Sequence, residues 1–188
     1  MLCAKSIEII VGPMFSGKST ELIRRCNNYE AIGFNVLIIN HVLDTRCEQN
    51  SVQTHSNNTK KAIKCEKLME LDISHIKSSK INVIAIDEAQ FFKDLLDFVK
   101  IMETKDIILL IAGLDGDCKR NPFGDILSCI PYCDQVTKLN AMCMVRKDGT
   151  LGAFTKRISN LENENQIDVG GSDKFIAVCR KEYLRNNF

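Results

Sequence analysis

The sequence predicts an α/β fold, an open parallel β-sheet with helices on its faces, followed by a small C-terminal subdomain. Two patterns carry this prediction. Short apolar segments rich in β-branched residues are separated by amphipathic stretches, which is typical of strand–helix–strand units with right-handed crossovers. From about Asn140 onward, short apolar pieces alternate with glycines and a polar run. We therefore expect a first unit over residues 1–139 and a smaller unit over residues 140–188.

Four segments predict strands of a sheet that is covered on both faces, because their apolar runs are nearly continuous. They are Ser6–Val11, Asn35–Ile39, Asn82–Ile86 and Ile107–Ala112. The amphipathic stretch Ser19–Ile32 predicts a helix that stops at Gly33. A second helix is predicted over Phe91–Met102, where apolar residues recur at helical spacing.

The remaining segments are less regular. Lys119–Pro131 predicts a loop followed by a short helix, and Gln135–Leu139 predicts a further strand. Asp44–Lys61 is polar and long for a simple connection, which favours a functional or mobile loop. An amphipathic segment near Asp173–Leu184 is expected to close the C-terminal subdomain.

Composition and charge exclude several classes of protein. The chain has 25 lysines and arginines against 24 aspartates and glutamates and shows no basic cluster, so we expect no nucleic-acid polymer as a partner. No apolar run reaches about 18 residues, and the N-terminus lacks the pattern of a signal peptide, so we expect a cytoplasmic protein without membrane contact. The nine cysteines are an odd number, and we interpret most of them as reduced, buried thiols.

The first predicted strand runs into a phosphate-binding pattern, Gly12-x-x-x-x-Gly17-Lys18-Ser19. Glycines let consecutive backbone N–H groups converge on phosphate oxygens, and the N-terminus of the following helix adds favourable partial charge. Lys18 is then placed to reach the β- and γ-phosphates, and the Ser19 hydroxyl to ligate Mg²⁺. The alternative is a tight strand–helix turn without a ligand. We favour a P-loop of the NTPase type, because the full pattern sits in its required context.

The third predicted strand ends in Asp87 and Glu88, an apolar run into carboxylates that is typical of a Walker-B element. Because parallel strands end at one edge of a sheet, Asp87 is expected to complete the magnesium shell of the P-loop. Glu88 is a candidate general base for an acceptor hydroxyl. Its alternative role is to favour the start of the next helix.

Asp44-Thr45-Arg46 follows the second predicted strand and is expected at the same edge. Arg46 could neutralise charge on a transferred phosphoryl group, although a surface ion pair explains it equally well. His41, His55 and His75 are interpreted as incidental.

The chain resembles the thymidine kinase family of vertebrate cytosol, many bacteria and large DNA viruses. The resemblance covers about Glu8 to Tyr183. It is carried, in order, by the segments GPMFSGKSTELIRR, DTR, TH (Thr54-His55), IDEAQFF, GLDGD, PFG and GGSDKF. The generic P-loop rule does not demand the Pro-Met-Phe-Ser interior, which makes the resemblance specific.

The resemblance implies transfer of the γ-phosphate of ATP to the 5′-hydroxyl of thymidine, usually also of deoxyuridine, with Mg²⁺ held by Ser19 and Asp87. Glu88 would be the base, with Lys18 and Arg46 beside it. It also implies a lasso-like lid and a homotetramer or dimer. Contacts to ATP would come from Gly12, Pro13, Met14, Phe15, Ser16, Gly17, Lys18, Ser19, Asp44, Thr45, Arg46, Asp87, Glu88, Ala89 and Gln90. Contacts to the nucleoside would come from Met14, Leu114, Cys118, Phe123, Thr155, Gln166, Ile167, Asp168, Val169, Gly170 and Phe175.

Two positions in the expected nucleoside site depart from the family pattern. Cys118 stands where the family has an aromatic residue after LDG-x, and Phe175 stands where a tyrosine is expected. Phe175 keeps the ring and loses only the hydroxyl. Losing the aromatic wall at Cys118 is expected to loosen nucleoside binding unless Phe123 supplies a ring nearby.

A third departure concerns zinc, which family members often bind through two Cys-x-x-Cys pairs. Here Cys143 and Cys179 are retained, but Arg146 and Glu182 stand at the other two positions. Arginine stays protonated and cannot ligate zinc. We therefore expect no zinc, and an Arg146–Glu182 ion pair beside two packed thiols in its place. A rebuilt site that recruits Cys133, or a Cys143–Cys179 disulfide, remains an alternative.

Two other functions are compatible with a P-loop. One is a switch or regulatory ATPase, although no Asn-Lys-x-Asp element for guanine is present. The other is a silent relative that only binds nucleotide, against which the intact Lys18, Asp87 and Glu88 argue. The deoxynucleoside kinase is the leading interpretation.

Overall fold

A six-stranded parallel sheet forms the centre of the molecule, as the sequence predicts. The structure is a computed structural model that describes residues 5–44, 51–53, 59–71, 80–159, 166 and 171–185. The strand order is β5-β2-β6-β7-β1-β8, and every neighbouring pair is parallel. The strands are β1 (Ser6–Val11), β2 (Val36–His41), β5 (Ile63–Cys65), β6 (Val83–Ile86), β7 (Ile108–Gly113) and β8 (Gln135–Lys138).

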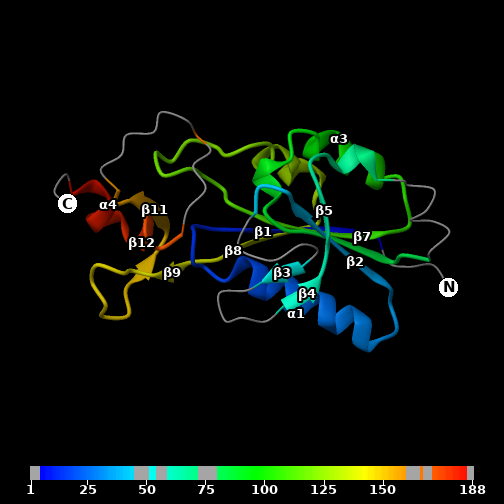
Figure 1. Cartoon of the computed structure of the whole chain (residues 1–188), viewed down its shortest axis with the longest axis horizontal. Helices are drawn as coiled ribbons and strands as arrows, with labels where there is room; N and C mark the ends of the chain where they lie inside the picture. The colour runs from blue at the N-terminus through cyan, green and yellow to red at the C-terminus, as the bar shows by residue number, and fades with distance from the viewer. Residues whose placement is uncertain are drawn as a thin grey trace.

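Helices cover the sheet on both faces (Figure 1). On one face α1 (Lys18–Ala31) packs its buried Leu22, Ile23 and Cys26 against the sheet. On the other face lies α3 (Leu95–Met102), together with short 3₁₀ turns at Leu68–Glu70 and Leu127–Tyr132.

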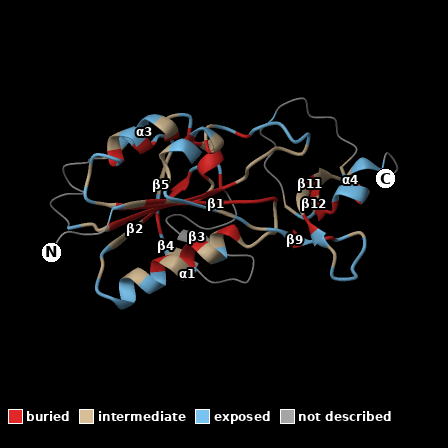
Figure 2. Ribbon diagram, turned by 180° about the vertical axis from the view of Figure 1, so that it is seen from behind, coloured by how far each residue is buried: buried red, intermediate tan, exposed pale blue. Residues whose placement is uncertain are grey.

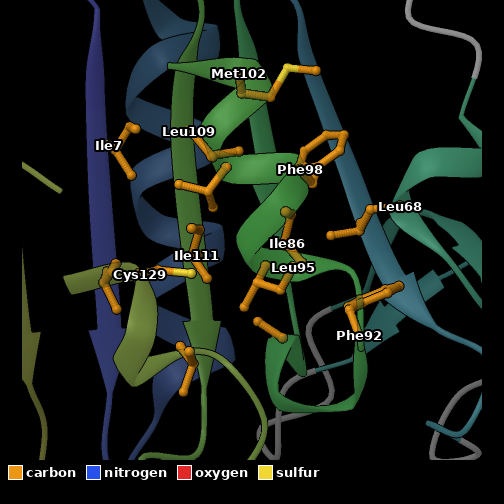
Figure 3. Packing of buried hydrophobic residues seen from close by; sticks show 14 of the residues in the cluster. Ile7, Leu68, Ile86, Phe92, Leu95, Phe98, Met102, Leu109, Ile111 and Cys129 are labelled. Atoms are coloured by element: carbon orange, nitrogen blue, oxygen red, sulfur yellow. The ribbon is translucent and has the colours of Figure 1, made fainter. Parts of the chain in front are cut away.

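The two faces of the sheet each hold a core cluster, and successive residues of one strand supply both. Ile9 belongs to the cluster under α3, whereas Ile10 belongs to the cluster under α1. Figure 3 shows the α3 side, where Leu95 and Phe98 of α3 lie in one cluster with Ile86 of β6 and with Leu109 and Ile111 of β7. The central strands are buried throughout, which appears as red ribbon between the two helical layers in Figure 2. Burial on both faces explains the continuous apolar runs of the sequence.

The second predicted helix is wrong at its start. Phe91–Met102 was predicted to be helical, but α3 begins at Leu95, and Ala89–Phe91 form a separate 3₁₀ turn. The helix cannot continue backward because Phe92 is extended. Phe92 instead turns its ring against His41 with 4.7 Å between the centroids.

The polar connection Asp44–Lys61 contains more structure than a plain loop. Its strands β3 (Ser51–Gln53) and β4 (Thr59–Lys61) pair antiparallel outside the main sheet. Residues 45–50 and 54–58 lie outside the described residues. The three-residue β5 follows directly, and its partly exposed segment gave no strand pattern in the sequence.

The C-terminal part forms separate small sheets beside the main one (Figure 1). Strands β9 (Ala141–Met142) and β10 (Leu151–Gly152) pair, as do β11 (Phe154–Arg157) and β12 (Phe175–Val178). The predicted amphipathic segment Asp173–Leu184 is in fact strand β12 followed by the short helix α4 (Arg180–Leu184). A third cluster centred on Cys143, Val178 and Cys179 packs this part. Among the described residues, no helix is long and apolar enough to cross a membrane.

We predict that Phe98→Ala lowers the free energy of unfolding by about 3–5 kcal/mol, because a fully buried ring would leave a cavity between α3 and the sheet. Urea denaturation followed by circular dichroism measures this loss. Ile32→Ala is the control, since Ile32 is 67% exposed and its truncation should change stability by less than about 0.5 kcal/mol. Equal losses in both variants would contradict the core assignment.

Candidate active site

Three loops leave the sheet side by side because their strands are in register. Val11, the last residue of β1, pairs with Gly113, the last residue of β7. Ile86, the last residue of β6, pairs with Ile111 of β7. The segments that begin at Gly12, Asp87 and Leu114 therefore start at the same edge of the sheet, where parallel α/β sheets commonly bind ligands.

The segment Gly12–Ser19 has the backbone conformation that a phosphate-binding loop needs. Gly17 is left-handed with φ 81° and precedes the first residue of α1, so the helix N-terminus faces the loop. A Cβ at Gly17 would meet no atom within 4 Å, which leaves open space in front of the loop. A Cβ at Gly12 would lie 2.4 Å from the carbonyl oxygen of Leu139, so only glycine fits there.

Lys18 lies inside this loop with 8% of its surface exposed. Its Nζ donates a hydrogen bond of 2.7 Å to the carbonyl oxygen of Pro13. The ammonium is thus held over the loop, where phosphate oxygens would meet both it and the N–H groups.

The donor set beside the loop suits a magnesium ion. Ser19 lines the cavity described below, and Asp87 is 1% exposed at the end of β6. A hydroxyl and a carboxylate are hard oxygen ligands, which Mg²⁺ prefers together with phosphate oxygens. Asp44 is also buried, and its carboxylate accepts a 2.8 Å hydrogen bond from the Asn40 amide.

Glu88 has a strained backbone and a fixed side chain. Its φ of 52° places a non-glycine residue in the left-handed region. Its N–H donates to Asp87 Oδ1 at 3.0 Å, and its carboxylate oxygen Oε2 accepts a 2.7 Å hydrogen bond from Gln90 Nε2. Gln90 Oε1 in turn accepts from the N–H of Leu114 at 2.9 Å.

A cavity of about 260 Å³ joins these groups. It brings together most of the predicted site residues, namely Met14, Phe15, Gly17, Lys18, Ser19, Asp44, Glu88, Gln90, Leu114, Cys118, Phe123, Thr155, Gln166 and Phe175. The lining does not include the predicted residues Gly12, Pro13, Ser16, Asp87 and Ala89, which shape the loops behind it. Thr45, Arg46, Ile167, Asp168, Val169 and Gly170 lie outside the described residues.

The sequence-based prediction missed two cavity residues in particular, Phe91 and Arg157. The Phe91 ring packs edge-on against Phe123 at 5.7 Å. Arg157 lies two residues after Thr155 on β11, so strand alternation places both on one face, and its guanidinium lies 5.2 Å from the Phe175 ring centroid. This alternation was the available signal for Arg157.

The C-terminal part contacts the cavity loops directly. The N–H of Met14 donates to Thr155 Oγ1 at 3.0 Å, which ties the P-loop to β11. Gln166 Nε2 donates to Asp117 Oδ2 at 3.1 Å and to the Pro122 carbonyl at 2.9 Å. Burial alone would raise the pKa of Asp117, but hydrogen bonds from Asn121, Gln166 and Lys119 outweigh it and lower the pKa.

Comparison with known proteins agrees with this geometry. The family model described as thymidine kinase matches residues 5–183. The chain belongs to the thymidine kinase family. Thymidine kinase of Myxoma virus (strain Uriarra) is 43% identical over 95% of this chain and 96% of its own length. Thymidine kinase of Vaccinia virus (strain Western Reserve) is 40% identical over 95% and 96%. Cytosolic thymidine kinase of Homo sapiens is 39% identical over 95% and 73%.

Within this member of the family, aromatic rings and guanidinium groups connect the C-terminal part to the cavity wall. The Tyr183 hydroxyl of α4 donates a 2.8 Å hydrogen bond to the carbonyl oxygen of Cys118. The Arg120 guanidinium lies 4.5 Å from the centroid of the Tyr183 ring, and Arg180 lies 4.8 Å from that of Phe154. The rings of Phe154 and Tyr183 are 5.5 Å apart. We call these four side chains and their contact to Cys118 the Tyr183 cluster.

The two retained cysteines lie together, but the expected ion pair beside them is wrong. The N–H of Cys179 donates to Cys143 Sγ at 3.3 Å, and both residues are buried, free thiols. Arg146 pairs with Asp148 at 2.9 Å, and Glu182 pairs with Arg185 at 3.2 Å. In each pair the two residues are within three positions of each other in the sequence. Such a pair costs less chain entropy than an ion pair between Arg146 and Glu182, which are far apart in the sequence.

The thiol of Cys143 keeps surroundings that favour a thiolate. Burial alone would raise its pKa, but hydrogen bonds from the backbone of Cys179, Arg146 and Val145 lower it. Among the described residues, no group of three or more His, Cys, Asp or Glu side chains is arranged to hold a metal ion. The absence of zinc itself stays a prediction.

His41 is structural rather than incidental. It is 4% exposed, packs between the rings of Phe91 and Phe92, and its Nδ1 accepts a 3.1 Å hydrogen bond from the N–H of Leu43. Burial lowers the pKa of His41, partly offset by a hydrogen bond to the Glu66 backbone and by the charges of Glu66 and Asp94.

We predict a loss of stability as the pH falls below the ordinary histidine pKa of about 6.5. The unfolded state binds the proton first, because the pKa of His41 is lowered in the folded state. Urea midpoints at pH 7.5 and 5.5 measure the effect. His41→Gln should show a smaller drop than the natural protein, since all other groups are shared. Equal drops would mean that His41 contributes nothing to it.

Proposed function

We propose that this chain is an ATP- and Mg²⁺-dependent thymidine kinase. It would transfer the γ-phosphate to the 5′-hydroxyl of thymidine, and also of deoxyuridine, and so supply a deoxynucleoside monophosphate for DNA precursor synthesis by salvage. One observation carries the proposal. The Lys18 ammonium and the Glu88 carboxylate line the same cavity, so a phosphate-binding group and a candidate base face one space.

At the phosphate end, the N–H groups of the Gly12–Ser19 loop and the N-terminus of α1 would bind the β- and γ-phosphates. Lys18 would exchange its bond to the Pro13 carbonyl for phosphate oxygens, because an anion is a stronger partner for an ammonium than a carbonyl. Arg46, which lies outside the described residues, is proposed to neutralise further charge.

Ser19 and Asp87 would hold the magnesium ion. When bound, it supplies positive charge next to the phosphate oxygens. Asp87 follows the last residue of β6 at the sheet edge, and its Oδ1 accepts a hydrogen bond from the N–H of Glu88, which orients the carboxylate.

At the acceptor end, Glu88 would take the proton of the 5′-hydroxyl as that oxygen attacks the γ-phosphorus in line. The new O–P bond forms as the bond from phosphorus to the bridging β–γ oxygen breaks, and ADP leaves. Gln90 already donates to one carboxylate oxygen at 2.7 Å, and the Glu88 side chain reaches the cavity.

The nucleoside end has apolar and aromatic walls. The cavity is lined by Met14, Leu114, Phe91, Phe123 and Phe175. The three phenylalanine rings could stack on a pyrimidine base, and the two aliphatic side chains could pack against it. Residues Gln166 to Gly170 are proposed to add main-chain hydrogen bonds to the base edge, by resemblance to the family. Residues 140–188 are proposed to act as a lid that excludes water, so that ATP is not hydrolysed.

By resemblance to the family, we also propose a cytoplasmic homotetramer or dimer. The ligands of the site would be two small molecules, ATP and the deoxynucleoside.

Incubation of the purified protein with Mg·ATP and a panel of deoxynucleosides tests the function. We expect monophosphate from thymidine and deoxyuridine, and ADP production that depends on the nucleoside. ADP production without nucleoside dependence would favour a regulatory ATPase instead. No turnover with intact ATP binding would favour a silent relative.

In the same assay, Glu88→Gln should lower kcat by about 10²–10⁴-fold, because the amide cannot accept the hydroxyl proton. ATP affinity, measured by calorimetry, should stay within about twofold. Glu103→Gln is the matched control, since Glu103 is exposed at the end of α3 and should keep full activity. Unchanged turnover in Glu88→Gln would mean that another residue is the base.

The metal content of the purified protein tests the expected absence of zinc. We predict no stoichiometric zinc by mass spectrometry, because only two of the family's four thiolate positions remain. Arg146→Cys/Glu182→Cys should gain one zinc per chain and a higher melting temperature, since structural zinc adds on the order of 10 kcal/mol to small domains. Stoichiometric zinc in the natural protein would overturn the prediction.

A further inference from the structure

The side-chain amide of Gln90 forms hydrogen bonds to two partners, one that follows the end of β6 and one that follows the end of β7. Its Nε2 donates to Glu88 Oε2 at 2.7 Å, and its Oε1 accepts from the N–H of Leu114 at 2.9 Å. Glu88 offers only an acceptor and Leu114 only a donor, so the two contacts fix which end of the amide points to which partner. No other uncharged side chain of this length supplies one donor and one acceptor in this way.

The surroundings of Gln90 are closely packed at its side-chain oxygen and at its backbone. Gln90 is 3% exposed. A Cβ at Gly113 would lie 2.6 Å from Gln90 Oε1, and a Cβ at Gly124 would lie 2.2 Å from the Gln90 carbonyl oxygen. Gly124 also has a left-handed φ of 58°, which favours glycine independently. Gly113 at the end of β7 therefore packs against the Gln90 side chain, and Gly124 packs against the Gln90 backbone.

Glu88 requires such a support because its own backbone does not hold the carboxylate. With a left-handed φ of 52°, Glu88 belongs neither to β6 nor to the Ala89–Phe91 turn. Regular secondary structure therefore does not orient its side chain. A glutamate has three rotatable side-chain bonds, and a general base is effective only within hydrogen-bond reach of the proton it takes.

We propose that Gln90 is a positioning residue that aims the Glu88 carboxylate at the acceptor hydroxyl and ties its place to the cavity wall at Leu114. This inference rests on the proposed kinase function. Leu114 lines the same cavity, so the wall on which a nucleoside would pack and the base that would deprotonate it are joined through one amide. Loss of the amide should then lower kcat and leave the binding of ATP intact.

Two variants separate positioning from simple packing. Gln90→Leu keeps most of the volume and removes both hydrogen bonds. Gln90→Glu keeps the shape and the acceptor for Leu114, but its new carboxyl can donate to Glu88 only while it is protonated. Once both carboxylates are ionised, they repel each other at this distance.

We expect kcat for thymidine phosphorylation to fall roughly 10–100-fold in Gln90→Leu, by the same factor at each pH from 5.5 to 8.5. In Gln90→Glu, the loss relative to the natural protein should be small at pH 5.5 and grow as the pH rises. KM for ATP should stay within about twofold in both. A structural role alone would lower kcat and the melting temperature together, whereas a positioning role lowers kcat in variants that keep the natural melting temperature.

Gln135→Leu is the matched control, because Gln135 is exposed on the edge strand β8 and should keep natural kcat. Melting temperatures show whether each variant is folded, and Gln90→Glu decides the test if Gln90→Leu is not. Natural kcat in the folded variants would overturn the proposal, as would a raised KM for ATP with unchanged kcat, which would make Gln90 a nucleotide contact. Absence of thymidine phosphorylation by the natural protein would instead refute the proposed function.

Discussion

The register of three parallel strands is the constraint on which the site depends. Because Val11 pairs with Gly113 and Ile86 with Ile111, the chain leaves β1, β6 and β7 at nearly the same height. The segments that begin at Gly12, Asp87 and Leu114 are thereby brought to one edge, although they are far apart in the sequence. A shift by one residue in β6 would turn its alternate buried side chains to the opposite face, so the two core clusters hold this register.

The backbone strain at Glu88 is small compared with the stabilisation from the buried residues on either side of it. Glu88 has a left-handed backbone, and such a conformation costs about 1–3 kcal/mol for a residue with a side chain. Asp87 before it and Ala89 after it are both buried, as are all four residues of β6. The core on either side therefore determines the backbone path at Glu88, and its side chain bonds to Gln90 without capping the Ala89–Phe91 turn.

The sequence was sufficient for features that depend on local patterns and insufficient for contacts between distant segments. Four apolar residues within Ser6–Val11 predict β1 with its observed bounds, and glycine spacing predicts the conformation around Lys18. The bond from Gln90 to Leu114 joins residues 24 apart, and no local pattern reports it. The three-residue β5 was missed because its pairing with β2, rather than its composition, makes it a strand. At Arg146 a neighbouring aspartate, Asp148, competed successfully with the distant partner that the family comparison suggested.

The Tyr183 cluster holds the C-terminal part through contacts between aromatic rings and guanidinium groups. Cation–π contacts contribute about 0.5–2 kcal/mol each, far less than a structural zinc ion. The cluster differs from a metal site in where it is anchored, because Tyr183 and Arg120 tie α4 to the Cys118–Asn121 turn of the larger part. The Cys118 side chain lines the cavity. Movement of α4 away from this turn would therefore break contacts to a residue of the cavity wall, so the packing of the C-terminal part and the shape of the cavity depend on the same few side chains.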